Sequence, residues 1–310
     1  SESYRPRANS GNQLTRTDPR QLRPRATADA KTLYTIDKLV AHSSSTASEN
    51  LWDSCIVPTK HERNIVVVVG DQQLVWYDLD ANYKPLATFE APVGLTFRCV
   101  GYTSTEVSGV ATNVCAAGSQ SCVLFCREPD NGRVEAYERV HVVGAEVTAI
   151  AFNPLKPNYM YCGTDDRKVY VWELFFEADG ALNANKSSYR YLYATNFCIV
   201  SIVYLLDTDS LAAVGESSDV LLFNDISAPK YVSIVTSITH CINAVLVYGA
   251  AQLFKTANLD PLETLDATDK WPSTMSAPII MRSVSISNDK KYVIGTTNKN
   301  IICFWKSTAI

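Results

Sequence analysis

The residues that could do chemistry are few and scattered in this chain. Among 310 residues, four histidines each stand alone near the junction of two strand patterns: His42, His61, His141 and His240. Neighbouring acids occur at Asp165-Asp166 and at Asp207 and Asp209, but acids in tight turns usually form the turn itself. The sequence has no G-x-S-x-G elbow, no glycine-rich phosphate loop and no H-E-x-x-H zinc motif. We therefore expect a binding protein without catalytic residues, the one enzymatic alternative being carboxylates that meet inside the fold.

The cysteines point away from metal or disulfide chemistry. There are nine of them, an odd set without a C-x-x-C pair, and most stand inside strand patterns, as Cys115, Cys162 and Cys303 do. A disulfide framework or a zinc site would cluster them. The pattern favours reduced, buried thiols in an intracellular protein, and we expect neither a metal nor another cofactor.

Composition limits the other classes. The chain is 46% hydrophobic and 19% charged, with a net charge of -4, which is ordinary for a soluble protein. The longest nearly apolar run, Phe197 to Leu206, is about half of the roughly 20 residues that cross a bilayer. The first residues lack the apolar core of a signal peptide. These features predict a cytoplasmic or nuclear protein that does not insert into membranes and has no small-molecule substrate.

The elements that must position any binding residue are β-strands arranged in a repeat. The clearest copy contains three strand patterns separated by two turns: Val147–Pro154, Tyr159–Asp166 and Lys168–Glu173. In weaker copies a glycine is followed by a large residue that ends the third strand: Gly70 to Tyr77, Gly118 to Cys126, Gly215 to Phe223 and Gly295 to Trp305, with a degenerate copy at 256–265. We expect the glycines and the neighbouring polar residues to supply turn conformations. A repeat of roughly 40 to 50 residues predicts stacked β-sheet units.

This pattern resembles the WD-repeat family over residues 32–310, strongly at 145–174 and weakly at 241–281. The resemblance implies an all-β fold, a single closed β-propeller of four-stranded blades. We count six blades, with seven, the family's commonest number, as the alternative. Cys162 replaces the family's hydroxyl before the second-strand glycine, so the family's polar network is expected to be incomplete. The family closes its ring with strands from the two chain ends, here 32–36 beside 301–305.

The resemblance also implies two rims on which partners could bind. One rim carries the turns between second and third strands, with these candidate partner-binding residues: Asp71, Asp165, Asp166, Arg167, Glu216, Asp219, Asp260 and Lys299. They could be solvated turn residues or a recognition surface for a basic or peptide partner. The opposite rim carries three long connections, 102–113, 175–188 and 266–278. Their aromatic residues Phe175, Phe176 and Trp271 are candidate partner anchors, unless they fold back onto the propeller.

The first 31 residues form a basic extension rich in arginine and proline. They carry seven basic and three acidic residues, a charge of 7 − 3 = +4, which leaves 21 − 29 = -8 for residues 32–310. Such a composition cannot form a core. The arginines suit carboxylates or phosphates of a partner: Arg5, Arg7, Arg16, Arg20, Arg23 and Arg25. The arm could thread across a partner protein, contact RNA, or remain a solvated tail.

These observations predict a non-catalytic scaffold, a WD-repeat subunit that holds other proteins of a larger complex on its rims and through its arm. Two alternatives remain open. The first is a component of an RNA-processing or ribonucleoprotein complex that contacts RNA through the arm. The second is a reader of a peptide mark that uses the acidic turns and the propeller channel.

Overall fold

The computed structural model describes the backbone of fifteen stretches of the chain. They are residues 34–41, 50–57, 63–127, 134, 136–141, 144–205, 210–215, 219–223, 230–233, 244–247, 250–254, 261–265, 281–287, 291–298 and 300–307. All of them belong to one compact unit, Leu33–Ile310. The arm residues of the sequence analysis, together with Glu216, Asp260, Trp271 and Lys299, lie outside the described residues. Within the described stretches, no helix is long and apolar enough to cross a lipid bilayer.

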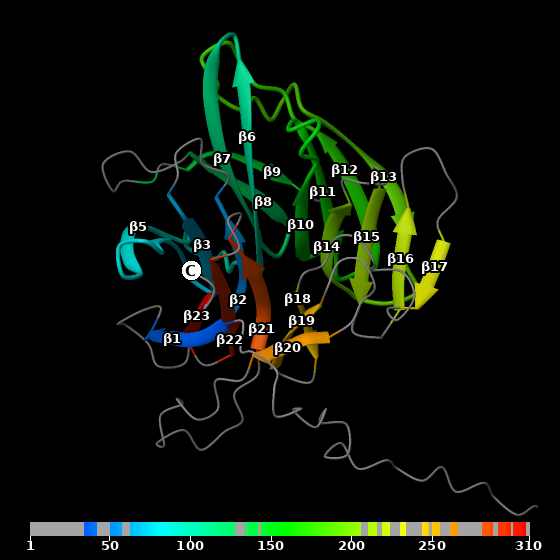
Figure 1. Ribbon diagram of the computed structural model, residues 1–310. Helices are drawn as coiled ribbons and strands as arrows, with labels where there is room; N and C mark the ends of the chain where they lie inside the picture. The colour runs from blue at the N-terminus through cyan, green and yellow to red at the C-terminus, as the bar shows by residue number, and fades with distance from the viewer. Residues whose placement is uncertain are drawn as a thin grey trace, which may run out of the picture. The chain divides into compact units, whose positions relative to one another are not determined.

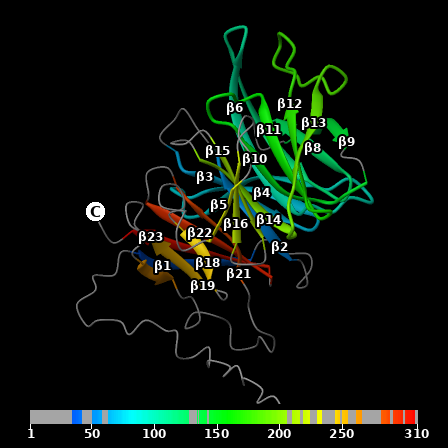
Figure 2. The ribbon, with the colours of Figure 1, turned by 90° about the vertical axis from the view of Figure 1, so that its right-hand side faces the viewer.

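The described strands form six antiparallel sheets, which we call blades 1 to 6 in chain order (Figures 1 and 2). Blade 1 contains β2 (Leu51–Ile56), β3 (Ile65–Gly70), β4 (Gln73–Asp78) and β5 (Lys84–Glu90). Blade 2 contains β6 (Cys99–Val107), β7 (Val110–Gly118), β8 (Cys122–Arg127) and β9 (Ala136–His141). Blade 3 contains β10 (Val147–Phe152), β11 (Tyr159–Thr164), β12 (Lys168–Glu173) and β13 (Ser188–Ala194).

The remaining blades follow the same plan. Blade 4 contains β14 (Ile199–Leu205), β15 (Ser210–Gly215), β16 (Asp219–Phe223) and β17 (Lys230–Ser233). Blade 5 shows three strands among the described residues, β18 (Ala244–Val247), β19 (Ala250–Phe254) and β20 (Pro261–Leu265). Blade 6 contains β21 (Met281–Ile286), β22 (Tyr292–Thr297), β23 (Ile301–Ser307) and β1 (Tyr34–Ala41). The predicted all-β propeller architecture is thereby confirmed.

The two ends of the folded unit meet in blade 6, as the sequence predicts. Strand β1 runs antiparallel to β23, with Ile36 opposite Trp305 and Leu39 opposite Cys303. The strand extends beyond the predicted end at residue 36, because a bulge between Ile36 and Lys38 lets the pairing continue to Ala41. The edge of β23 is therefore covered by a strand from the other end of the unit.

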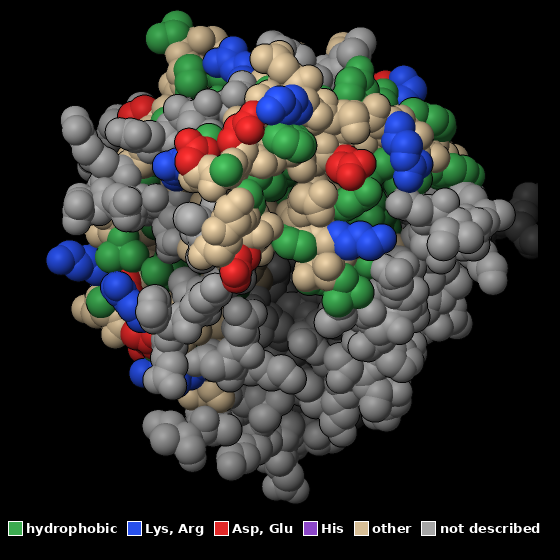
Figure 3. Space-filling model, turned by 90° about the horizontal axis from the view of Figure 1, so that it is seen from above, with side chains coloured by type: hydrophobic (Ala, Val, Ile, Leu, Met, Phe, Trp, Pro, Cys, Tyr) green, Lys and Arg blue, Asp and Glu red, His purple; other side chains and the backbone are tan. Residues whose placement is uncertain are grey.

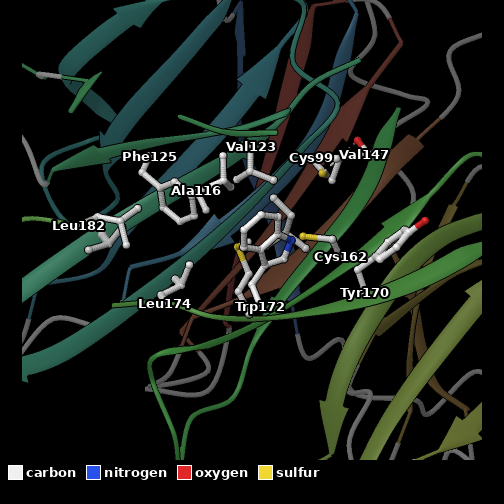
Figure 4. Close-up of a cluster of buried hydrophobic side chains, with 14 residues drawn as sticks. Cys99, Ala116, Val123, Phe125, Val147, Cys162, Tyr170, Trp172, Leu174 and Leu182 are labelled. Carbon is white, nitrogen blue, oxygen red and sulfur yellow. Dashed lines mark hydrogen bonds between the residues drawn. The ribbon is translucent and has the colours of Figure 1, made fainter. Parts of the chain in front are cut away.

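Buried side chains fill the spaces between neighbouring blades. The first strands of adjacent blades contact each other in the pairs β2–β6, β6–β10, β10–β14, β18–β21 and β21–β2. Strand β3, Ile-Val-Val-Val-Val-Gly, is buried along its whole length because both of its faces are covered by other blades. Figure 4 shows the cluster between blades 2 and 3, where Phe125 of β8, Trp172 of β12 and Leu182 lie together. The buried Nε1 atoms of Trp76 and Trp172 have no acceptor among the described residues, so the expected polar network is incomplete there.

The glycines of the repeat have a different purpose from the one expected. A Cβ on Gly118 would lie 2.4 Å from Cys99 Sγ and 2.8 Å from Val147 Cγ1 of the next blade. A Cβ on Gly163 would lie 2.6 Å from Ile199 Cγ2 of the next blade. Neither glycine has a positive φ; in the turn after Gly163 the left-handed residue is Arg167, with φ 67°. The turn role is therefore wrong for these two glycines, which allow close packing of blades instead.

Candidate protein-interaction surfaces

The first long connection forms a protruding hairpin. Strands β6 and β7 pair over their whole length, from Cys99 opposite Gly118 to Val107 opposite Val110. Ser108 and Gly109 join them, both with positive φ, 51° and 80°, as the twist of a two-residue hairpin requires. In Figure 1 the tip of this hairpin extends beyond the neighbouring strands. We call this end of the blades, where first strands end and third strands end, the long-connection rim.

The second long connection separates the two predicted anchors. Phe176 makes an isolated bridge to Leu182 and packs against the cluster between blades 2 and 3, in which Leu174 and Leu182 are buried. Phe175, by contrast, is 42% exposed. The backbone N–H of Phe175 donates to Ser187 Oγ at 3.0 Å, which ties the two ends of the connection together. Phe176 therefore folds back onto the propeller, and Phe175 is available on the rim.

A second exposed apolar residue belongs to the same part of the rim. Leu155 is 62% exposed, at the turn between β10 and β11. Asn153 Oδ1 fixes this turn by accepting the backbone N–H of Leu155 at 2.9 Å. The Leu174 N–H donates to the Asn158 carbonyl at 2.8 Å, so the turn and the Phe175 connection are bonded to each other. We call Leu155 and Phe175, with the connection that carries them, the blade 3 platform.

Charged groups accompany the platform. Lys186 Nζ lies 4.8 Å from the centre of the Phe175 ring and pairs with Glu177 Oε1 at 2.8 Å. Figure 3 shows the face toward which the β6–β7 hairpin extends, and on it basic, acidic and apolar side chains of the described residues are interspersed. Recognition on this rim would therefore depend on individual side chains more than on a broad field of one sign.

At the opposite end of the blades, which we call the turn rim, two predicted acids are structural. Asp71 Oδ2 accepts both the backbone N–H and the Nδ2 of Asn50 at 3.2 Å, and its Oδ1 accepts Trp52 Nε1 at 2.6 Å and Arg98 Nη1 at 2.9 Å. Asp165 Oδ1 accepts the backbone N–H of Glu146 at 2.9 Å. Each acid thus fixes the entry to the first strand of its own blade.

The other candidates on the turn rim differ among themselves. Asp166 is bonded within its own turn to Thr164 Oγ1 and Lys168 Nζ. The carbonyl of Arg167 accepts the Thr195 N–H at 2.7 Å, while its side chain is exposed. Asp219 is the first residue of β16, paired opposite Ser233, so it lies in a strand instead of a turn. Among these, Arg167 is the residue whose side chain is most available to a partner.

The turn rim also carries an aromatic and arginine cluster that the sequence pattern did not predict. Arg98 bridges blades 1 and 3, because its Nη1 pairs with Asp71 at 2.9 Å and its Nε with Glu146 at 2.7 Å. Its guanidinium carbon lies 4.1 Å from the centre of the Trp52 ring, and that of Arg282 lies 4.9 Å from the same ring. One sequence feature could have indicated this cluster: the second residue of the first strand is Trp52 in blade 1 and Arg282 in blade 6.

Asp53 is the one strongly perturbed acid among the described residues. It follows Trp52 on β2, and its carboxylate accepts the N–H of Val100 in blade 2 at 3.1 Å and that of Ser54 at 2.8 Å. Burial raises its pKa to about 6, and the hydrogen bonds from Val100, Ser54 and Ser283 oppose that rise. The carboxyl therefore links neighbouring blades through hydrogen bonds.

Comparison with known proteins finds the fold and no sequence relative. No protein-family model matches the sequence, and no curated protein matches it. In structure, 1107 chains match, so the fold alone selects no function. One is a chain in the structure of a humanized mutant of the Chaetomium thermophilum Polycomb Repressive Complex 2 bound to the inhibitor GSK126. It is 8% identical, with a TM-score of 0.56, and the match covers 89% of this chain and 98% of that chain.

Proposed function

We propose that this protein is a non-catalytic interaction scaffold, a WD-repeat-type subunit that holds protein partners in a multi-subunit assembly. The observation that carries the proposal is the blade 3 platform, where Phe175 is 42% exposed directly beside the anchored Phe176. An exposed aromatic ring on a fixed backbone loses little conformational freedom when a partner covers it. The mechanism is placement, since blades packed on one another hold their rims at fixed angles. We assign it no chemical step and expect it inside the cell, in the cytoplasm or the nucleus.

Two further observations support a scaffold. On the turn rim, Asp71 and Asp165 are bonded to the protein's own backbone and side chains. That pattern suits a rigid support better than a reactive centre. A chain of similar fold occurs in the structure of a repressive complex. The RNA-contacting and peptide-reading roles remain alternatives, and the nuclease arm of the experiment below distinguishes the RNA-contacting one.

The test is affinity purification of the full chain at native salt, with partners identified in the wild type and in Phe175→Ser. We expect Phe175→Ser to weaken capture of at least one protein partner by about tenfold, because truncating a buried interface anchor costs more than 1 kcal/mol. Its free energy of unfolding should change by less than about 0.5 kcal/mol, as for most surface substitutions. Phe176→Ser, whose ring packs against the core, should instead lower that free energy by about 1–3 kcal/mol.

Val93→Ser is the matched control, since Val93 is a fully exposed apolar residue on the turn rim. It should capture the same partners as the wild type. A parallel sample treated with nuclease identifies contact through RNA, because loss of every partner in that sample would favour the ribonucleoprotein role. Equal capture by Phe175→Ser and the wild type would contradict the platform as a binding surface.

A further inference from the structure

In blades 1, 3, 4 and 6, an irregularity in the pairing of the first strand leaves one residue near its start outside the regular register. In blade 1 the pairing of β2 with β3 shifts between Leu51 and Asp53, which leaves Trp52 outside the regular register. In blade 6 the pairing of β21 with β22 shifts between Met281 and Ser283, which leaves Arg282 outside it. Bulges redirect side chains and are common next to binding sites. Because β2 and β21 are in contact, the two displaced residues meet at the inner edge of the rim.

Trp52 is held in a fixed orientation there. Its Nε1 donates a hydrogen bond of 2.6 Å to Asp71 Oδ1. The guanidinium carbon of Arg98 lies 4.1 Å from the ring centre and that of Arg282 lies 4.9 Å from it. Both arginines are therefore within cation–π range of one indole, from the blades on either side of blade 1.

The two arginines differ in how their donors are used. Arg98 forms ion pairs with both Asp71 and Glu146, and its side chain is 27% exposed. Arg282 is exposed, and no ion pair joins it to a carboxylate among the described residues. Each carboxylate oxygen of Asp71 already accepts two hydrogen bonds, which uses the roughly four lone-pair positions of that group. Asp71 therefore bonds to Arg98, Trp52 and Asn50 and has no acceptor position left for Arg282. The N–H donors of Arg282 can then bind a partner.

We propose that Arg282, resting on Trp52, is a recognition site for an anionic group on a peptide partner, either a carboxylate or a phosphate. A guanidinium supported by an aromatic ring presents a planar fork that can bind both oxygens of such a group. The two arginines Arg98 and Arg282 balance the charges of Asp71 and Glu146, so the net field around the site is weak and selectivity comes from the fork. The site lies on the rim opposite the blade 3 platform. The proposal for this site and the scaffold proposal for the platform can therefore be tested separately.

The test follows the indole N–H signals of the full ¹⁵N-labelled chain by NMR. The chain has five tryptophans, and Trp52→Phe assigns the signal of interest by its disappearance. Three blocked tripeptides are titrated at constant ionic strength, with a central phosphoserine, a central glutamate or a central serine. We expect a saturable shift of the Trp52 signal with the phosphoserine peptide, the glutamate peptide or both. Which of them binds identifies the source of the anion.

Two matched variants complete the experiment. Arg282→Gln keeps most of the aliphatic stem and should weaken the binding of the anionic peptide by at least about tenfold, since hydrogen bonds to charged groups are the strong ones. Arg190→Gln, at an exposed arginine on β13, should bind like the wild type. Thermal melting confirms that both variants are folded. The proposal is overturned if neither anionic peptide shifts the signal, if the serine peptide shifts it equally, or if Arg282→Gln binds as the wild type does.

Discussion

Gly163 shows how one missing methyl group sets the distance between blades. A Cβ at this position would lie 2.6 Å from Ile199 Cγ2 and 3.1 Å from Ile202 Cδ1. We predict that Gly163→Ala lowers the free energy of unfolding by about 1–3 kcal/mol, the usual cost of overpacking a close-packed interior. Urea denaturation measures this directly, through the midpoint and slope of the transition.

The Ile199→Ala background separates this clash from any effect on β11 itself. Ile199→Ala alone should be destabilising, because Ile199 is 1% exposed. In that background Gly163→Ala should cost clearly less, since the nearest atom of Ile199 is gone. Equal costs in both backgrounds would mean that the two sites do not interact, and the packing explanation of the repeat glycine would be lost.

Asp53 makes stability depend on pH with an unusual sign. Its pKa is about 6 in the folded chain against an ordinary value of 3.8, so the folded state binds the proton more tightly. Stability contributed by this residue is therefore present below pH 4 and falls as the pH rises through 6, by up to about 3 kcal/mol. We predict that Asp53→Asn, which cannot ionise, becomes more stable relative to the wild type between pH 4 and pH 7.

Asp166 supplies the opposite case for the same titration. Burial acts to raise its pKa, but hydrogen bonds from Lys168 and Thr164 outweigh it and leave the pKa lowered. Its contribution is present above its ordinary pKa and is lost as the pH falls. Asp166→Asn should therefore change the pH profile in the direction contrary to Asp53→Asn. Parallel profiles for both variants would show that the Asp53 carboxyl is not buried as described.

At the scale of the element, strands were foreseeable where local pattern and burial agree. The strands at Lys168–Glu173 and Ile301–Ser307 follow from apolar runs bounded by polar turns, and so does the closing strand that begins at Tyr34. The platform was foreseeable in part, because Phe175 and Phe176 stand together in a long connection. Which of the two rings is exposed depends on Leu182, which no local pattern pairs with Phe176.

The cluster on the turn rim could not be predicted in the same way. A bulge depends on the partner strand, because a shift of one residue in register redirects every side chain beyond it. Trp52 and Arg282 are far apart in sequence and meet only when blades 6 and 1 are adjacent. In the sequence Arg98 is an isolated charge, and only the fold brings it into ion pairs with Asp71 and Glu146. Long-range pairing therefore determines the site, and the repeat pattern determines only its supports.

At the scale of the whole folded unit, closure through β1 should control stability. Val40 packs against the cluster shared by blades 6 and 1, and Ser54 Oγ of blade 1 lies 2.9 Å from Ser285 Oγ of blade 6. Removing residues 1–41 deletes β1 and uncovers the edge of β23. We predict a melting temperature lower by several degrees, because 1 kcal/mol corresponds to about 2–4 °C in domains of 150–250 residues. We also expect concentration-dependent association through the uncovered edge.

The shorter truncation, which removes residues 1–32, is the matched control for the pairing of β1 with β23. It removes the basic extension and leaves Tyr34–Ala41 intact, so it should melt as the full chain does and remain unassociated. Differential scanning calorimetry gives the melting temperatures, and light scattering over a range of concentrations gives the association state. If both truncations melt at the temperature of the full chain, the pairing of β1 with β23 contributes little to stability, and the packing between blades stabilises the ring. A lower melting temperature in both would instead place stabilising contacts within the first 32 residues.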